Sequence, residues 1–152
     1  MTTVCLVGDA DTDLRRELLS RETAREALLP YDLYSPFANT VALDTVSLGA
    51  AVALCNDLDW YLVRFVDDVL IREPSVDDAE WLSRELAEAI RNERVAPADT
   101  GRHLRVYGRR EDRLLDPMYL ARTHDTHPSY DLHDVDDTVV VRVTESEFSD
   151  PD

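Results

Sequence analysis

Residues 40–66 read TVALDTVSLGAAVALCNDLDWYLVRFV, and the order of patterns in this stretch decides the predicted fold. Residues 40–46 are mainly apolar and β-branched, which favours a strand. Ser47 offers an N-cap for a short helix over 48–58, which is apolar on nearly all sides and is therefore expected to be buried on more than one side. Residues 60–66 form the most strand-like run of the chain. The stretch predicts a strand, a buried helix and a second strand.

The segments that follow extend this order. Residues 67–68 suit a hairpin turn into a return strand over 69–72. A capping-box-like start and apolar residues at helical spacing predict a helix over 75–95. A strand over 103–108 then completes the order β-α-β-β-α-β, which is that of a ferredoxin-like (split βαβ) core at 40–107.

Shorter segments flank this core. A strand and a helix are predicted before it and two strands after it: 3–7, 12–29, 114–122 and 138–144. The chain from residue 145 is mostly acidic, which predicts a frayed tail over 145–152. The expected fold class is therefore α+β, with a single domain over 1–144.

The predicted helix over 12–29 contains a conflict on its apolar face. In a continuous helix, Arg21 and Arg25 fall within the arc of the buried leucines. The helix breaks near Ser20, or the two arginine stems are buried with their heads in solvent, or the two arginines form an anion pocket. The sequence leaves these three alternatives open.

The charge balance is the strongest compositional signal. The chain has 152 residues, 16 Lys+Arg against 32 Asp+Glu, a formal charge of −16 and 44% hydrophobic residues. All 16 basic residues are arginine, and Asp outnumbers Glu by 21 to 11. In molar salt the Debye length is about 3 Å, so carboxylates hydrate the surface with little mutual repulsion, whereas lysine stems are salted out. The pattern predicts a halophilic source, and an acidic protein from a GC-rich mesophile is the alternative.

This interpretation limits what the charge says about partners. A negative charge that serves solvation is no evidence for a cationic partner. The same net charge disfavours a nucleic-acid surface that is basic overall, but it does not exclude a basic patch that binds nucleic acid locally. The sequence contains no apolar run of the ~18–20 residues that span a bilayer, and its N-terminus does not resemble a secretion signal. We therefore expect a cytoplasmic protein with no membrane partner.

The two cysteines, Cys5 and Cys55, each lie in an apolar run. The chain contains no CxxC motif, so a redox or structural zinc motif is not indicated. Both cysteines are predicted to be buried free thiols, because Cys behaves as a small hydrophobe.

Acidic side chains follow the first predicted strand, at Asp9, Asp11 and Asp13. Such aspartates are typical of haloacid-dehalogenase-like phosphatases, in which they attack phosphorus, transfer protons and bind Mg²⁺. The chain departs from that pattern, because Asp13 stands where the family has Thr or Val, and because there is no Lys. An EF-hand match also fails, since Leu14 and Ser20 occupy its sixth and twelfth positions. Asp9 and Asp11 are candidate metal ligands, and a solvated acidic start of a helix is the alternative.

Three of the four histidines lie within ten residues and are interleaved with acids: His124, His127 and His133. Imidazole and carboxylate groups suit Zn²⁺, Mn²⁺ or Ni²⁺, which makes these histidines candidate metal ligands. Their spacing matches no defined motif and lies in a predicted loop, so a solvated loop is the alternative.

Two further groups have a binding interpretation. The densest positive patch comprises Arg102, Arg105, Arg109, Arg110 and Arg113, which could contact a phosphate or an acidic protein, or lie solvated on a hairpin. The aromatic residues of 60–66 suggest a base-stacking strand like that of an RRM. The glycine-containing RRM motif is missing, which favours packing in the core.

Four segments together resemble an uncharacterised family of small acidic haloarchaeal proteins, which is a domain of unknown function: 4–9, 17–27, 45–52 and 59–65. The resemblance covers most of the chain. It implies a source and a compartment, and it provides no catalytic residues and no cofactor.

Two functions remain open. The first is a non-enzymatic cytoplasmic binding or regulatory domain, with a homodimer through an exposed sheet as one arrangement. The second is a small metal-dependent hydrolase or phosphoryl-transfer enzyme that uses Asp9 and Asp11 or the loop over 124–133. Convergence of the three histidines would favour the metal site, and Asp9 and Asp11 in a cleft at the carboxyl edge of the sheet would favour phosphoryl chemistry.

Overall fold

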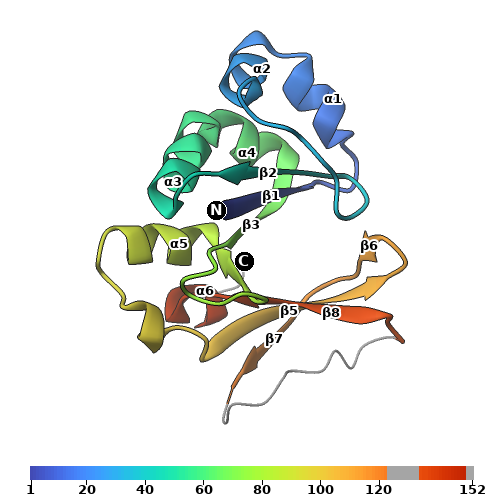
Figure 1. Ribbon diagram of the computed structural model, residues 1–152. Coiled ribbons are helices and arrows are strands. Elements are labelled where there is room, and N and C mark those ends of the chain that lie inside the picture. The colour runs from blue at the N-terminus through green and yellow to red at the C-terminus, as the bar shows by residue number, and fades with distance from the viewer. Residues whose placement is uncertain (123–133, 150–152) are drawn as a thin grey trace.

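The computed structural model describes residues 1–122 and 134–149, in which eight strands form one mixed sheet (Figure 1). The strands are β1 Thr2–Gly8, β2 Thr40–Thr45, β3 Val66–Arg72, β4 Trp81–Ser83, β5 His103–Arg110, β6 Arg113–Leu114, β7 Met118–Ala121 and β8 Asp137–Arg142. The helices are α1 Leu14–Leu19, α2 Glu22–Leu28, α3 Leu48–Asp57, α4 Asp59–Phe65, α5 Arg84–Arg91 and α6 Glu145–Ser149, with a 3₁₀ turn η1 at Pro97–Asp99. The expected α+β class is confirmed.

The order of strands does not confirm the ferredoxin-like arrangement at 40–107. The order is β2-β1-β3-β4-β8-β5-β6, with β7 also pairing with β5. Because β1 is antiparallel to both neighbours, β2 and β3 are parallel to each other and are joined through α3 and α4. A split βαβ unit is therefore present, but the strand inserted into it is β1, which lies outside 40–107. β5 pairs with β8 rather than with a strand of that unit.

One face of the first half of the sheet lies under the helices (Figure 1). We call this packing the helix-covered core, and it joins apolar side chains of α1–α5 to those of β1–β4. Its fully buried members include Leu6, Leu14, Leu18, Leu43, Leu58, Ile71 and Leu82.

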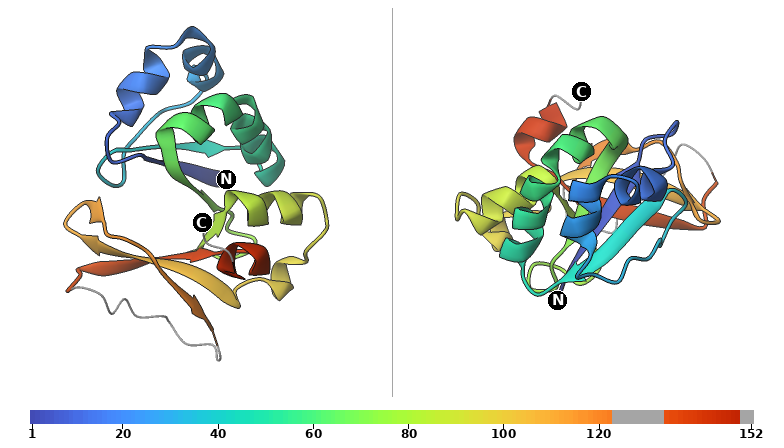
Figure 2. Two further views of the ribbon diagram at one scale, coloured as in Figure 1. Left: turned by 180° about the vertical axis from the view of Figure 1, so that it is seen from behind. Right: turned by 90° about the horizontal axis from the view of Figure 1, so that it is seen from above.

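The opposite face of the first half packs against the second half, because the sheet folds over (Figure 2). We call this packing the inter-sheet core. It joins side chains from β1–β4 to side chains from β5, β8 and the residue that follows β8: Cys5, Ala42, Leu70, Trp81, Tyr107, Val139, Val141 and Val143. Successive residues of a strand point to opposite faces, so Cys5 and Leu6 belong to different cores.

Several local predictions are confirmed. The Ser47 hydroxyl accepts from Ala50 N at 3.1 Å and caps α3. The predicted helix over 12–29 breaks, because α1 ends before Ser20 and α2 begins at Glu22. Ser20 does not cap α2, since its hydroxyl donates to the carbonyl of Glu17. The break lets each short helix turn its own apolar residues inward.

The strand predicted over 60–66 is wrong, because these residues form helix α4 and the start of β3. Leu58 and Leu62 are buried and Tyr61 and Phe65 are partly buried, a spacing that places all four on one helical face. Packing of that face outweighs the β-propensity of the run. The turn predicted at 67–68 is also wrong, since both residues belong to β3.

The helix predicted over 75–95 is shortened to α5, which begins after Ser83. The Asp77 carboxylate accepts from the backbone N–H groups of Ala79 and Glu80, at 2.9 and 2.6 Å, and so forms a turn. Residues 81–83 then form β4, which directs Trp81 and Leu82 into different cores. The N-cap is Ser83, whose hydroxyl accepts from Leu86 N at 3.1 Å.

The acidic segment after residue 144 contains a helix where we predicted a frayed tail. Residues 144–147 read TESE, which is a capping box. The Thr144 hydroxyl accepts from Glu147 N at 3.1 Å, and the Glu147 carboxylate accepts from Thr144 N at 3.0 Å. Phe148 packs against the inter-sheet core and lies 4.9 Å from the ring of His103, centroid to centroid.

The thiols of Cys5 and Cys55 are free and buried, as predicted. Burial raises the pKa of Cys5 to about 12 and that of Cys55 to about 11, so both stay protonated in the fold near neutral pH. Within the part of the chain that the structure describes, no helix combines the length and the apolar character needed to cross a bilayer.

Candidate functional site

The predicted metal ligands near the N-terminus do not converge. Asp9 and Asp11 lie exposed in the turn between β1 and α1. The backbone of Asp9 is held by Phe65 O and by the side-chain amide of Asn39, both at 2.9 Å. Among the described residues, no three His, Cys, Asp or Glu side chains are grouped so that they could hold a metal ion. The other predicted ligands fall outside the described residues: His124, His127 and His133.

The arginines of the predicted positive patch do not share one surface. Arg105 is only 9% exposed and points into the inter-sheet core. Arg109 is half-buried and lies 3.9 Å from the carboxylate of Asp137. The other three are exposed: Arg102, Arg110 and Arg113. The sequence cluster is dispersed because Arg110 points to the opposite face of β5 from Arg105 and Arg109, while Arg102 precedes β5 and Arg113 lies on β6.

A buried polar cluster surrounds Arg105. Its guanidinium donates to Asp68 at 2.6 Å, and the hydroxyl of Tyr107 donates to the other oxygen of Asp68 at 2.5 Å. The N–H of Val69 donates to the same carboxylate at 2.8 Å. Burial raises the pKa of Asp68, although these donors favour the charged carboxylate. Burial and the neighbouring carboxylate raise the pKa of Tyr107, so its hydroxyl keeps the proton that it donates.

Helix α6 connects to this cluster through Glu147. The hydroxyl of Ser83 donates to the Glu147 carboxylate at 2.5 Å, and Arg105 lies 3.7 Å from its second oxygen. The same residues line a pocket of about 350 Å³ between α4, α5 and α6. Both carboxylates of the cluster already have protein partners. The cluster therefore has a structural role: its hydrogen bonds and ion pairs connect β3, β4, β5 and α6.

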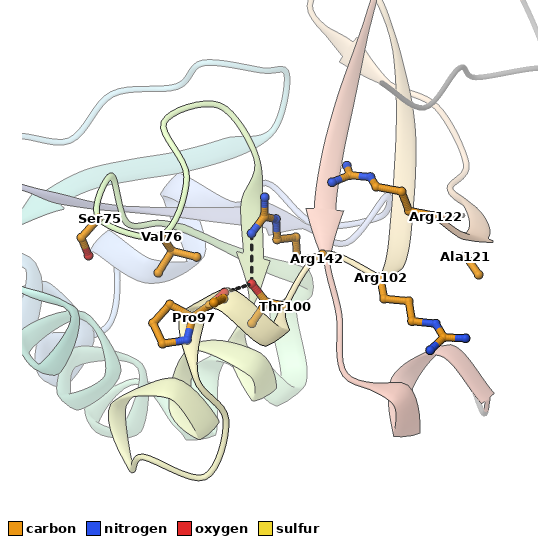
Figure 3. Close-up of a pocket in the computed structure, with 10 residues that line it drawn as sticks. Ser75, Val76, Pro97, Thr100, Arg102, Ala121, Arg122 and Arg142 are labelled. Carbon is orange, nitrogen blue, oxygen red and sulfur yellow. Dashed lines mark hydrogen bonds between the residues drawn. The ribbon is translucent and has the colours of Figure 1, made fainter. Parts of the chain in front are cut away.

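A different group of arginines lines a pocket of about 900 Å³ (Figure 3). We call it the arginine pocket. Arg102 precedes β5, Arg122 follows β7 and Arg142 ends β8. In the register of the sheet, His103 lies opposite Ala121 on one side, and Leu104 lies opposite Arg142 on the other. Three segments far apart in sequence therefore end at the same edge of the sheet.

Two carboxylates hold part of this pocket in place. Glu80 accepts from Arg142 Nε at 2.8 Å and from Arg122 Nη2 at 2.5 Å. Asp77 accepts from Arg142 Nη2 at 3.3 Å, and the Thr100 hydroxyl from Arg142 Nη1 at 3.0 Å. All three guanidinium nitrogens of Arg142 are therefore engaged.

The turn that positions these carboxylates also keeps Asp77 charged. Burial alone would raise the pKa of the Asp77 carboxyl, but the backbone N–H groups of Glu80 and Ala79 and the nearby Arg142 together lower it. Asp77 therefore remains a carboxylate beside Arg142 across the neutral and mildly acidic range.

Donors in the arginine pocket remain available. Arg122 uses only Nη2, and its Nε is buried with no hydrogen-bond partner among the described residues. Within those same residues the guanidinium of Arg102 has no ion pair or hydrogen bond, and Figure 3 shows it pointing away from the other two. Three arginines against Glu80 and Asp77 leave the group with an excess positive charge in a chain of −16. The arrangement suits an anion that accepts hydrogen bonds from guanidinium groups.

Residues 100–102 form the wall of the pocket. Gly101 has a φ of 100°, a backbone conformation that other residues rarely adopt. A Cβ at this position would lie 3.2 Å from Arg142 Cζ. A glycine is required here because the backbone turns directly against the guanidinium of Arg142.

Arg122 and Arg142 were missing from our sequence prediction. Arg142 interrupts the β-branched run over 138–144, and a single charge in such a run could have marked it as a candidate. The pairing of β5 with β8 has no signal in the sequence. The prediction therefore found Arg102 without its neighbours.

Comparison with known proteins identifies the family and no activity. No curated protein and no solved structure gives a significant match to the chain. One family model matches residues 2–109, which is more than half of the chain and ends within β5. Arg102 lies within the matched range, whereas Arg122 and Arg142 lie beyond it. The chain belongs to DUF5804, a family of unknown function.

Proposed function

We propose that this protein is a non-enzymatic binding domain that takes an anionic ligand in the arginine pocket. The observation that carries the proposal is the pair of guanidinium nitrogens of Arg122, Nε and Nη1, that have no partner among the described residues, beside a pocket of about 900 Å³. A hydrogen bond to a charged group contributes about 1.5–3 kcal/mol, so two such donors are enough for selective binding. Glu80, which Arg142 also binds, keeps the Arg122 side chain in place before the ligand arrives.

Binding, rather than chemistry, is supported by the groups in the pocket wall. Its described lining consists of three arginines, Ser75, Thr100 and small or apolar residues, without a carboxylate or imidazole. Arginine stays protonated at all physiological pH values, so it stabilises a charge without exchanging protons. The alternative proposal is a metal-dependent hydrolase or phosphoryl-transfer enzyme. Its metal ligands would have to include residues outside this pocket.

Titration calorimetry with inorganic pyrophosphate tests the proposal. We expect wild-type protein to bind pyrophosphate, and Arg122→Ala to weaken binding at least tenfold, because a charged hydrogen bond is lost. Arg113→Ala is the matched control, since Arg113 is equally cationic but lies exposed on β6. Measurements at 0.2 M and 2 M KCl separate a specific site from general charge attraction.

The proposal is contradicted if wild-type protein does not bind pyrophosphate. It is also contradicted if the two variants weaken binding equally, because the effect would then come from overall charge. A thermal melt of each variant shows that the fold is retained, since Arg142 still holds Glu80 when Arg122 is removed.

We further infer that the source is a halophilic archaeon and the compartment its cytoplasm. The support is the 32 acids against 16 arginines and no lysine, together with two free thiols, which suit a reducing compartment. Charge screening is largely complete near 1 M KCl, where the Debye length is about 3 Å. Screening therefore cannot account for a rise in the free energy of unfolding between 1 and 3 M KCl. We expect such a rise in a halophilic protein. A free energy of unfolding that is constant over that range would favour the mesophilic alternative.

A further inference from the structure

A second cavity of about 370 Å³ lies between the end of α5, the η1 turn, the start of β5 and the residues that precede α6. Its lining overlaps that of the arginine pocket only at residues 100–102. The cavity is large enough for a small organic ligand, since binding pockets start at about 300 Å³. The second cavity can therefore bind a ligand of its own, different from that of the arginine pocket.

The lining of this second cavity includes an apolar surface. Leu86 and Val143 are buried, at 3% and 4% exposure, and come from α5 and from the residue that follows β8. Val95 and Ala96 add apolar surface from the segment that follows α5. Because Leu86 and Val143 are already buried, a ligand seated here buries apolar area mainly on Val95 and Ala96, which contributes about 25 cal/mol per Å².

Four exposed charged side chains also line the cavity, two of each sign: Arg94, Asp99, Arg102 and Glu145. Within residues 1–122 and 134–149, none of the four forms an ion pair or a side-chain hydrogen bond, with each other or with any neighbour. Elsewhere in the chain such opposite charges pair directly, as Arg122 and Glu80 do at 2.5 Å. Charges of both signs therefore surround one small space and remain available to a ligand.

We propose that the second cavity binds a zwitterion with an apolar side chain, that is, a free apolar amino acid. A simple anion would meet the arginines but would be repelled by Asp99 and Glu145, and a simple cation would meet the reverse problem. A zwitterion places its carboxylate near the arginines, its ammonium near the acids and its side chain on Val95 and Ala96. This proposal goes beyond the anion site, because it concerns another cavity and another class of ligand.

Three ligands of matched shape test the charge requirement by titration calorimetry. L-Leucine carries both charges, 4-methylpentanoate lacks the ammonium group and 3-methylbutylamine lacks the carboxylate. We expect L-leucine to bind at least tenfold more tightly than either analogue, because each analogue leaves one pair of charges without a partner. Equal binding of L-leucine and 4-methylpentanoate would overturn the proposal, as would the absence of L-leucine binding.

A pair of tryptophan substitutions locates the site. Ala96 and Ala98 are both exposed and flank Pro97, but Ala96 lines the second cavity and Ala98 the arginine pocket. We expect Ala96→Trp to abolish L-leucine binding and leave pyrophosphate binding unchanged. Ala98→Trp should do the reverse. Both substitutions are on the surface, so neither should prevent folding, which a thermal melt checks.

The two proposals fail in different ways in this experiment. Pyrophosphate binding that survives Ala98→Trp overturns the anion site and leaves the amino-acid site intact. L-Leucine binding that survives Ala96→Trp overturns the amino-acid site, whatever pyrophosphate does.

Discussion

The two faces of the first half of the sheet are packed by different means. The helix-covered core is formed by apolar side chains, with Leu14 and Leu18 fully buried against β1 and β2. The inter-sheet core contains a charged pair, Asp68 and Arg105, whose side chains are each 11% exposed. The same sheet therefore supports a core held by apolar contact and a core held partly by a salt bridge.

The difference shows how each core specifies its partner. Apolar packing is non-directional, so several short helices can fold onto β1–β3 as long as their volumes match. A buried carboxylate must meet a donor, so Asp68 on β3 accepts only a register that brings Arg105 and Tyr107 to it. The polar cluster thus selects how the second half of the sheet docks on the first.

The largest effect is expected from Asp68→Ala. This change leaves the buried Arg105 with only the more distant carboxylate of Glu147, which costs about 3–5 kcal/mol of unfolding free energy. Urea denaturation of the wild type and the variant measures the loss. Replacing both partners by apolar residues, Asp68→Leu with Arg105→Met, should recover most of it, because no charge is then left buried. A loss below 1 kcal/mol for Asp68→Ala would show that the pair does not hold the inter-sheet core.

Alkaline pH should destabilise both cores through their thiols. The pKa values of Cys5 and Cys55 are raised from 9.0 to about 12 and about 11, so above pH 9 the unfolded chain loses protons that the folded chain keeps. Their contribution to stability is complete below pH 9 and is lost as the pH rises toward 11 to 12. The loss is on the order of a few kcal/mol by pH 11.

Cys55→Ala isolates the part of the alkaline loss of stability that comes from the helix-covered core. Its unfolding free energy should fall less steeply between pH 9 and 11 than that of the wild type, because one of the two thiols no longer titrates. Identical slopes for the wild type and the variant would contradict the burial of Cys55.

Two arginines that stack on tryptophans provide a matched pair. Arg72 lies 4.5 Å from the ring centroid of Trp81, which is buried in the inter-sheet core, and Arg64 lies 3.8 Å from that of the half-exposed Trp60 on α4. We expect Arg72→Ala to cost about 2 kcal/mol and Arg64→Ala about 0.5–1 kcal/mol, because desolvation strengthens a cation–π contact. Thermal unfolding of both variants measures the difference, and the reverse order would contradict this assignment.

The smallest difference between the two cores is expected from their helix caps. Ser47→Ala removes the cap of α3 in the helix-covered core and should cost about 1 kcal/mol. Thr144→Ala removes half of the capping box of α6 and also loosens Glu147, so it should cost somewhat more. Chemical denaturation of the two variants decides the order. An equal or smaller cost for Thr144→Ala would show that α6 does not hold the inter-sheet core.

The comparison also explains which elements were predictable from the sequence. β2 and α3 follow from local signals, namely a β-branched run and the Ser47 cap. α4 was missed because its residues have high β-propensity, although Leu58 and Leu62 already had helical spacing. β4 was missed because its three residues form a strand only when β3 and β8 lie on either side of them.

The candidate site was predicted in part for the same reason. Arg102 lies in a visible arginine cluster, but that cluster disperses along β5. Arg122 and Arg142 reach the pocket only through the pairing of β5 with β7 and β8. The TESE capping box at 144–147 was a readable signal that we interpreted as a tail.

The sequence by itself determined the acidic, lysine-free surface, the α+β class, the free thiols and those elements that have strong caps or alternating patterns. These features depend on composition or on neighbours within a few residues. Only the tertiary structure decided that β1 lies between β2 and β3, that Asp68 meets Arg105, and that three distant arginines line one pocket. Each of these depends on strand register between segments separated by tens of residues, for which local propensity carries no information.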